Sequence, residues 1–222
     1  MRLNECPDSR IHKKKRYEFK YSYSRIALNT KAAKQFALDK LDSELDEDLV
    51  YHSVEHTLDV VNAARLLGEM EGLVSNDILL LETAALYHDI GFTETYEDHE
   101  EHSVKIARKA LPEFGYSQND IEIIAGAINA TKIPQKPKNL LEEVLADSDL
   151  DYLGREDIFV IGQRLHYEWN RQGRDMSLVE WHETQIRFLQ KHRYFTQSAL
   201  NLREARKQEN IRELENLLYR ER

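Results

Sequence analysis

The sequence has few of the features that stabilise small secreted folds or anchor a chain in a membrane. Its 222 residues include a single cysteine, Cys6, so no disulfide can form within the chain. No apolar run approaches the roughly 18 residues that span a bilayer, and no charged and then apolar leader opens the sequence. We therefore expect a cytoplasmic protein without a membrane partner, long enough to bury its own core.

Signals for β-structure are also missing. We find neither hairpin dipeptides nor sustained alternation of apolar and polar residues, whereas apolar residues recur at helical spacings of three and four. This pattern predicts an all-α fold. The expected helices cover residues 30–45, 54–69, 76–88, 98–111, 117–131, 139–153, 155–172, 177–191 and 196–220.

Polar residues and glycines mark the ends of these helices. A serine or an asparagine precedes four of them and can accept a hydrogen bond from the first turn. These expected caps are Ser53, Asn76, Ser117 and Ser177. Glycines stand where four helices should stop, as is common at helix C-termini. They are Gly72, Gly91, Gly115 and Gly173.

Charge is distributed unevenly along the chain. The net charge is −9, but residues 1–30 contain eight Lys or Arg and three Asp or Glu, so they carry +5 and the other residues carry −14. An acidic body is a poor surface for nucleic acid, which is bound through cationic groups. We interpret residues 1–29 as a basic, solvated N-terminal extension, with a targeting or nucleic-acid patch as the alternative.

The last expected helix is densely charged and has only a thin apolar stripe. Ile211, Leu214 and Leu218 form this stripe. It can pack on the body of the protein or on a second subunit, and we favour the body. A homodimer therefore remains an alternative.

The strongest chemical signal lies where a very apolar stretch stops. Residues 78–87 are apolar on nearly every side of a helix, and His88 and Asp89 follow directly. A buried helix that ends in two metal-competent side chains must satisfy them locally or bind something with them.

Three further stretches concentrate imidazoles and carboxylates. They read YHSVEHT around His56, YEDHEEHS around His99, and LADSDLDYLG, which contains Asp147, Asp149 and Asp151. Packed helices can bring these side chains to one point. A mixed site of imidazole and carboxylate ligands suits Mn, Fe, Co, Ni or Zn, with Mg as a further candidate. Such an ion polarises a phosphoryl oxygen and lowers the pKa of bound water.

The order His, His-Asp, Asp on an all-helical chain resembles the HD-domain superfamily of metal-dependent phosphohydrolases. The resemblance covers roughly residues 30–170, and its most specific part is ALYHDIGF preceded by YHSVEHT. It implies an HD-domain-like helical bundle over residues 30–172, with a C-terminal helical extension over 173–222 packed on it.

The resemblance also implies the metal ligands. These are His56, His88, Asp89 and one aspartate of the DSD stretch, for which we choose Asp149. Helical spacing does not decide the last ligand, because Asp149 continues a row with Leu141 and Leu145, whereas Asp151 lies nearer the mean apolar direction. Asp151 therefore remains an alternative, as does Asp147.

Three more residues are candidates for catalysis beside Asp89. His99 and Glu100 follow the His-Asp pair and resemble residues that serve a second metal or move a proton in relatives. Lys132 stands where two-metal relatives carry further histidines, which favours one ion and leaves Lys132 either to meet a phosphate or to be a solvated lysine. His52 is expected to support the ligands rather than bind metal.

We expect a metal-dependent phosphohydrolase or phosphodiesterase acting on a nucleotide or another small phosphorylated metabolite. The alternatives are a di-iron oxygenase of the same fold and a non-catalytic metal- or nucleotide-binding module. The C-terminal histidines and both tryptophans, Trp169 and Trp181, are interpreted as helix-packing residues.

Overall fold

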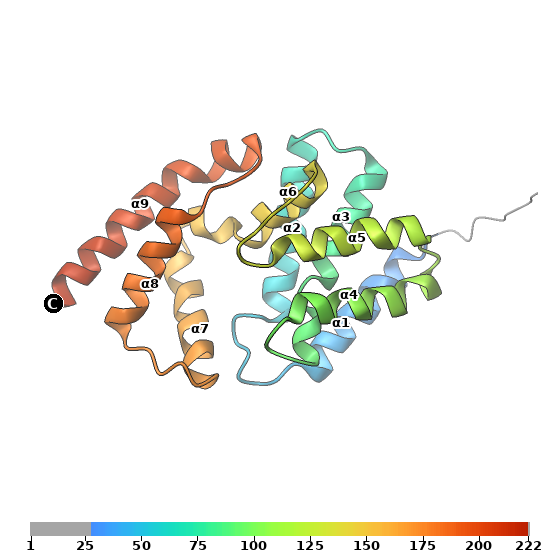
Figure 1. The fold of residues 1–222 in the computed structure, drawn as a ribbon. Coiled ribbons are helices and arrows are strands. Elements are labelled where there is room, and N and C mark those ends of the chain that lie inside the picture. The colour runs from blue at the N-terminus through green and yellow to red at the C-terminus, as the bar shows by residue number, and fades with distance from the viewer. Residues whose placement is uncertain (1–27, 222) are drawn as a thin grey trace, which may run out of the picture.

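The computed structural model describes residues 28–221, so nearly all of the expected basic extension lies outside the described residues. Within the described part there are nine α-helices, three short 3-10 helices and no strand (Figure 1), which confirms the all-α prediction. The elements are α1 (Thr30–Glu44), α2 (Val54–Met70), α3 (Ser75–Tyr87), η1 (Ile90–Thr93), α4 (His99–Ala110), η2 (Leu111–Phe114), α5 (Gln118–Thr131), α6 (Leu140–Asp149), η3 (Asp151–Gly154), α7 (Ile158–Arg171), α8 (Leu178–Lys191) and α9 (Gln197–Glu221).

Three of the four expected N-caps are in place. The hydroxyl oxygens of Ser53, Ser117 and Ser177 each accept a hydrogen bond from a backbone N–H in the first turn of their helix, and the last two belong to reciprocal capping boxes. Asn76 was the wrong choice for α3, which begins one residue earlier after Val74 and has no side-chain cap. Local hydrogen bonding therefore sets most of the helix starts.

Glycine has two separate roles in this fold. Gly72, Gly115 and Gly173 have φ angles of 76°, 84° and 82°, a left-handed conformation that only glycine adopts without strain. Gly91 instead lies within η1, where an added Cβ would stand 2.0 Å from the carbonyl oxygen of His99. The absence of a side chain at Gly91 thus lets η1 pack directly on the start of α4.

The larger hydrophobic core is built from α1 to α6. Side chains such as Leu41, Leu67, Leu81 and Leu145 are buried to 1% exposure or less, because these helices present long apolar faces to one another. In Figure 1, α2 and α6 lie in the middle of the molecule, between the remaining helices of this core and the C-terminal helices. The helices that carry His56 and Asp149 therefore lie in the middle of the molecule.

A second core joins the C-terminal helices to the turn after α6. Ile186 and Leu189 of α8 pack there with Ile211 and Leu214 of α9, and Leu218 lies at its edge. The apolar stripe of the last helix thus packs on its own chain, on the outer side of α7 and α8 (Figure 1). The second core also contains Tyr51, Leu150, Tyr152, Leu153 and Ile158.

The prediction of one helix over residues 139–153 was wrong at its C-terminal end. α6 stops at Asp149, Leu150 leaves the α-helical conformation, and the short 3-10 helix η3 follows from Asp151. Two contacts with α9 account for the break: Arg203 donates hydrogen bonds of 2.6 and 3.0 Å to Asp151, and Gly154 lies so close to Arg203 that an added Cβ would be 2.5 Å from its carbonyl oxygen.

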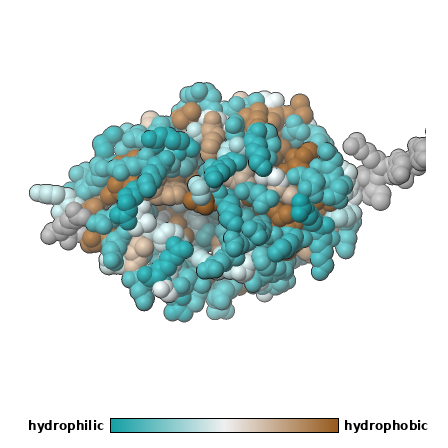
Figure 2. All heavy atoms as spheres, in the orientation of Figure 1, coloured by the Kyte–Doolittle hydropathy of each residue, from teal (hydrophilic) through white to brown (hydrophobic). Residues whose placement is uncertain are grey.

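None of the helices within residues 28–221 is long and apolar enough to cross a membrane. Hydrophilic residues cover most of the face drawn in Figure 2, and hydrophobic residues appear between them in patches.

A buried histidine in the C-terminal part is expected to make stability sensitive to acid. Neither ring nitrogen of His192 has a hydrogen-bond partner among the described residues, and its backbone oxygen accepts a hydrogen bond from the fully buried Lys207. Burial lowers the pKa of His192 to about 4, and the charge of Lys207 adds to this effect. As pH falls below about 6.5, His192 therefore becomes protonated in the unfolded chain, whereas it stays neutral in the folded protein until the pH approaches 4.

We expect the free energy of unfolding to be roughly 2 kcal/mol lower at pH 5 than at pH 7, since the pKa of an unfolded histidine is about 6.5. His192→Phe keeps a ring of similar size and removes the titrating group. Its melting temperature should therefore fall less than that of the wild type between pH 7 and pH 5. Equal losses in the two proteins would show that His192 does not cause the acid sensitivity.

Candidate metal centre

Three helix ends meet at a cluster of imidazoles and carboxylates. His56 lies in the first turn of α2, His88 directly follows α3, and Asp149 is the last residue of α6. One potential ligand atom of each lies within 4.8 Å of the others. Asp89 completes the cluster, so the structure brings together all four residues that the family resemblance selects as ligands.

The nitrogen and oxygen atoms of the cluster face one another at short range. His88 Nε2 lies 3.1 Å from Asp89 Oδ2, 3.3 Å from Asp149 Oδ1 and 3.4 Å from His56 Nε2. His56 Nε2 lies 3.2 Å from Asp149 Oδ1 and 3.4 Å from Asp89 Oδ2. Electron-pair donors from four side chains therefore converge on one small volume.

Local hydrogen bonding fixes the tautomer of His88. Its Nδ1 lies 2.7 Å from the carbonyl oxygen of Ala85, which can only accept, so Nδ1 carries the proton. Nε2 of the neutral ring then points a lone pair at the carboxylates. Asp89 Oδ2 is fully buried and has no hydrogen-bond partner among the described residues. A buried oxygen without a hydrogen-bond partner, beside a ring nitrogen whose lone pair faces the carboxylates, fits a bound cation.

The charges in the cluster also indicate a site for a cation. Burial alone would lower the pKa of His56, but the nearby carboxylates of Asp149 and Asp89 raise it to about 9. Burial would raise the pKa of Asp149, yet the nearby imidazoles of His56 and His88 hold it at about 2. The carboxylates thus stay ionised and require positive charge beside them, which protons or a divalent cation can supply.

The other two aspartates of the DSD stretch lie elsewhere. Asp147 accepts hydrogen bonds from the backbone N–H groups of Phe195 and Thr196, at 2.9 and 2.8 Å, and so holds the start of α9. Asp151 pairs with Arg203. Of the three, Asp149 alone is among the residues that the structure groups with His56 and His88.

His99 and Glu100 open α4 beside the cluster. His99 Nε2 lies 3.5 Å from Asp89 Oδ1 and 3.6 Å from Glu100 Oε1, and Glu100 is only 7% exposed. The ring of Phe92 holds the imidazole in place, since its centroid lies 3.9 Å from that of His99 and the rings are stacked. Both side chains are therefore next to the candidate ligands without being part of the closest group.

Lys132 is not brought to the cluster. Its Nζ donates hydrogen bonds of 2.7 Å to Asp98 and 3.3 Å to Glu101, and its side chain is 42% exposed. Both carboxylates are exposed, at 64% and 58%, so the lysine takes part in a surface ion pair. The solvated alternative describes Lys132 better.

Sequence reasoning missed a buried carboxylate that supports the site. Glu168 of α7 is fully buried and accepts hydrogen bonds from the backbone N–H groups of Tyr51 and His52, at 3.0 and 3.1 Å. Its other oxygen lies 2.5 Å from Nδ1 of His52 and accepts a 3.2 Å bond from Tyr96. A single Glu in an amphipathic helix carries no signal of such a role, because its partners lie more than 70 residues away.

A family model supports what the geometry indicates. The model described as "HD domain" matches residues 53–177, which is more than half of the chain and contains every member of the cluster. The chain belongs to the HD domain family. Among curated proteins, none matches the sequence.

Two solved structures share this HD fold. A protein of an uncultured Thermotogales bacterium, described as a predicted HD superfamily hydrolase, is 21% identical with a TM-score of 0.58, and the match covers 86% of this chain and 91% of that one. A protein of Lactobacillus plantarum is 18% identical with a TM-score of 0.61, and the match covers 84% and 95% of the two chains. At these identities the likeness establishes the fold.

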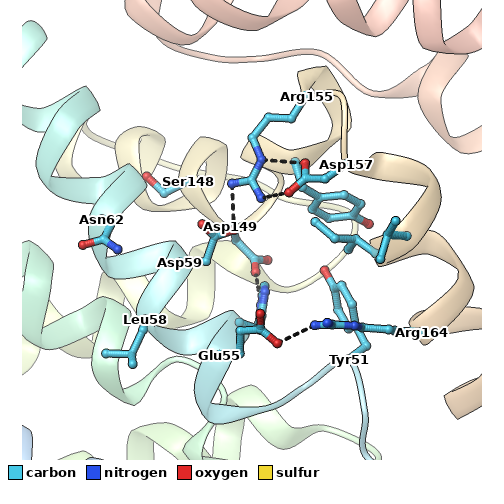
Figure 3. A pocket seen from close by; sticks show the side chains of 14 residues that line it. Tyr51, Glu55, Leu58, Asp59, Asn62, Ser148, Asp149, Arg155, Asp157 and Arg164 are labelled. Atoms are coloured by element: carbon cyan, nitrogen blue, oxygen red, sulfur yellow. Dashed lines mark hydrogen bonds and ion pairs between the residues drawn. The ribbon is translucent and has the colours of Figure 1, made fainter.

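A polar cavity borders the HD cluster on one side (Figure 3). It has a volume of about 390 Å³ and is lined by Asp149 together with charged residues of α2 and α7. Arg155 binds Asp157 and Asp59, with 2.7 Å from Arg155 Nη1 to Asp59 Oδ2, and Glu55 accepts a 2.6 Å bond from Arg164. Both arginines are therefore already neutralised by carboxylates, which makes this cavity a poor site for an anion.

Proposed function

We propose that this chain is a metal-dependent phosphohydrolase that cleaves a phosphate ester of a small metabolite, as a monoesterase or a diesterase. The observation that carries the proposal is the buried convergence of two imidazoles and two carboxylates at the ends of α2, α3 and α6. Membership of the HD domain family supports it, as does the similar protein described as a predicted HD superfamily hydrolase.

In this proposal His56, His88, Asp89 and Asp149 hold one divalent ion. A divalent ion of this kind polarises a phosphoryl oxygen and supplies a water nucleophile near neutral pH. His88 is preset as a ligand because its other nitrogen donates to a backbone carbonyl. The mixture of nitrogen and oxygen donors is compatible with Mn, Fe, Co, Ni or Zn, and less so with Mg, which prefers oxygen ligands.

His99 and Glu100 are proposed to handle the proton. Hydrolysis forms a bond from water oxygen to phosphorus and breaks the bond from phosphorus to the ester oxygen, so one proton must leave the water and one must reach the departing oxygen. Glu100 is a buried carboxylate and His99 an imidazole beside it, which gives an acceptor and a donor next to the ligands. Asp89 orients His99 through its second oxygen.

The experiment that tests this function is metal analysis of the purified protein, followed by hydrolysis assays with added Mn²⁺. The panel contains phosphomonoesters, cyclic nucleotides and deoxynucleotides, and the products are inorganic phosphate or nucleotide. We expect bound metal and turnover of at least one class without oxygen. Turnover only with oxygen would favour the oxygenase, and bound metal with no turnover would favour the binding module.

A further inference from the structure

A second cavity lies between the cluster and the C-terminal helices. It has a volume of about 410 Å³, within the usual range for small-molecule sites. On the side of the cluster it is lined by Asp89, His99, Glu100 and Asp149. A substrate that reaches the candidate ligands from this side must place the rest of its structure in the remaining volume.

The other side of this cavity is aromatic and aliphatic. Its wall consists mainly of side chains from α7, α8 and η3, which include Leu153, Leu165, Trp169, Trp181, Phe188 and Leu189. The rings of Trp169 and Trp181 meet edge to face with 5.3 Å between their centroids, so their orientation is fixed by packing. Flat apolar surface of this kind binds aromatic groups well.

Positive charge is scarce in the same cavity. Arg174 is the one Lys or Arg among the described residues that line it, and its guanidinium carbon lies 4.0 Å from the centre of the Trp169 ring. Three carboxylates, those of Asp89, Glu100 and Asp149, stand on the opposite side. One phosphate can be neutralised by the ion at the cluster, but the additional charges of a polyphosphate would meet little beside Arg174.

We infer that this cavity binds a flat aromatic group of the substrate, which is linked to a single phosphate that lies at the cluster. The inference rests on the proposed hydrolase function and narrows its substrate class to monophosphate esters of aromatic compounds, including nucleosides. The C-terminal helices, which supply no candidate ligand, then determine which ester is accepted.

Binding can be measured without turnover. The chain contains only two tryptophans, and both line this cavity, so tryptophan fluorescence reports directly on its occupancy. The full-length protein with Mn²⁺ is titrated with benzylphosphonate and with propylphosphonate, which have the same head group and cannot be hydrolysed at phosphorus. We expect benzylphosphonate to saturate the change at a concentration about tenfold lower, since an aromatic contact adds that much affinity.

A variant pair locates the effect. Phe188→Ala shortens the aromatic wall and leaves both tryptophans and the cluster in place, so it should weaken benzylphosphonate binding by about tenfold and propylphosphonate binding by less than about twofold. Tyr167→Ala is the control, because Tyr167 is on α7 but is 51% exposed and does not line the cavity. Leu165→Ala replaces Phe188→Ala if metal content or melting temperature shows that the latter is misfolded.

Kinetics separate this inference from the hydrolase function. Benzyl phosphate and propyl phosphate both release primary alcohols, so their intrinsic reactivities are similar, and we expect kcat/KM to be about tenfold higher for the benzyl ester. Hydrolysis of both esters with equal kcat/KM, together with equal binding of the phosphonates, would overturn the aromatic site and leave the hydrolase function standing. Release of phosphate from neither ester and no turnover in the wider panel, together with benzyl-selective binding, would overturn the hydrolase function and support the aromatic site.

Discussion

Replacing His88 with alanine is expected to leave the purified protein nearly free of metal. Nε2 of His88 lies within 3.4 Å of donor atoms from His56, Asp89 and Asp149, so the variant removes the atom at the centre of the proposed ligand set. Metal affinity should fall by more than about a hundredfold. Loss of a residue that only hydrogen-bonds to a metal ligand typically lowers the affinity by about tenfold to a hundredfold, so a larger loss marks a direct ligand. His56→Ala and Asp89→Ala should behave in the same way, as measured by elemental analysis after dialysis.

His102→Ala is the matched control for these variants. His102 is a second imidazole of α4, but its Nδ1 lies 2.8 Å from Glu94 and its side chain is 32% exposed. It should retain the metal content of the wild type. Full metal content in His88→Ala would remove His88 from the site.

The three neighbouring aspartates give a sharper test of the fourth ligand. Asp149→Ala should lose metal, whereas Asp147→Ala and Asp151→Ala should keep it and lose stability instead, because they leave the start of α9 and Arg203 without their partners. If Asp151→Ala is the metal-free protein, the assignment of Asp149 is wrong.

Turnover should depend on Glu100 even when metal is bound. Glu100 is 7% exposed, lines the cavity beside the cluster and lies near His99. Glu100→Gln keeps the shape of the side chain and removes its ability to take a proton. We expect kcat to fall by about a hundredfold to ten-thousandfold, with metal content and melting temperature unchanged. A fall of about tenfold is the least that a role in proton transfer requires. His99→Ala should also lose at least about tenfold in kcat while it retains metal.

Glu101→Gln provides the control at the next position of the chain. Its side chain is 58% exposed and pairs with Lys132 on the surface, so kcat should stay within about twofold of the wild type. Near-normal kcat in both Glu100→Gln and His99→Ala would mean that neither residue moves a proton. Loss of metal in His99→Ala would instead make His99 a ligand.

Helix positions were predictable because local interactions determine them. The capping boxes at Ser117 and Ser177 and the left-handed glycines act within a few residues of the helix ends, so their signals are present in the sequence. The break after Asp149 was not predictable, because it depends on Arg203 more than 50 residues away. The helical projection that favoured Asp151 assumed an unbroken helix, but the helix ends at Asp149, before Asp151.

Two parts of the site depended on tertiary structure. From the sequence, Lys132 could either meet a phosphate or be a solvated lysine. Its pairing with Asp98 and Glu101 on the surface depends on how the helices pack, which the sequence does not show. Trp169 and Trp181 do pack together, as expected for aromatic residues on amphipathic helices. That they also line a cavity next to the candidate ligands follows from how α7 and α8 approach α4, which helical periodicity cannot show.

Glu168 and Asp147 tie the C-terminal helices to the segments that position the cluster. Glu168 of α7 binds the backbone just before α2, and Asp147 of α6 binds the backbone just before α9. Unfolding of the C-terminal helices would therefore release two anchors of the cluster at once, so the two cores should melt as one cooperative unit. Through thermodynamic linkage, metal at a thousandfold excess over its dissociation constant would then add about 4 kcal/mol to the stability of helices that never touch it.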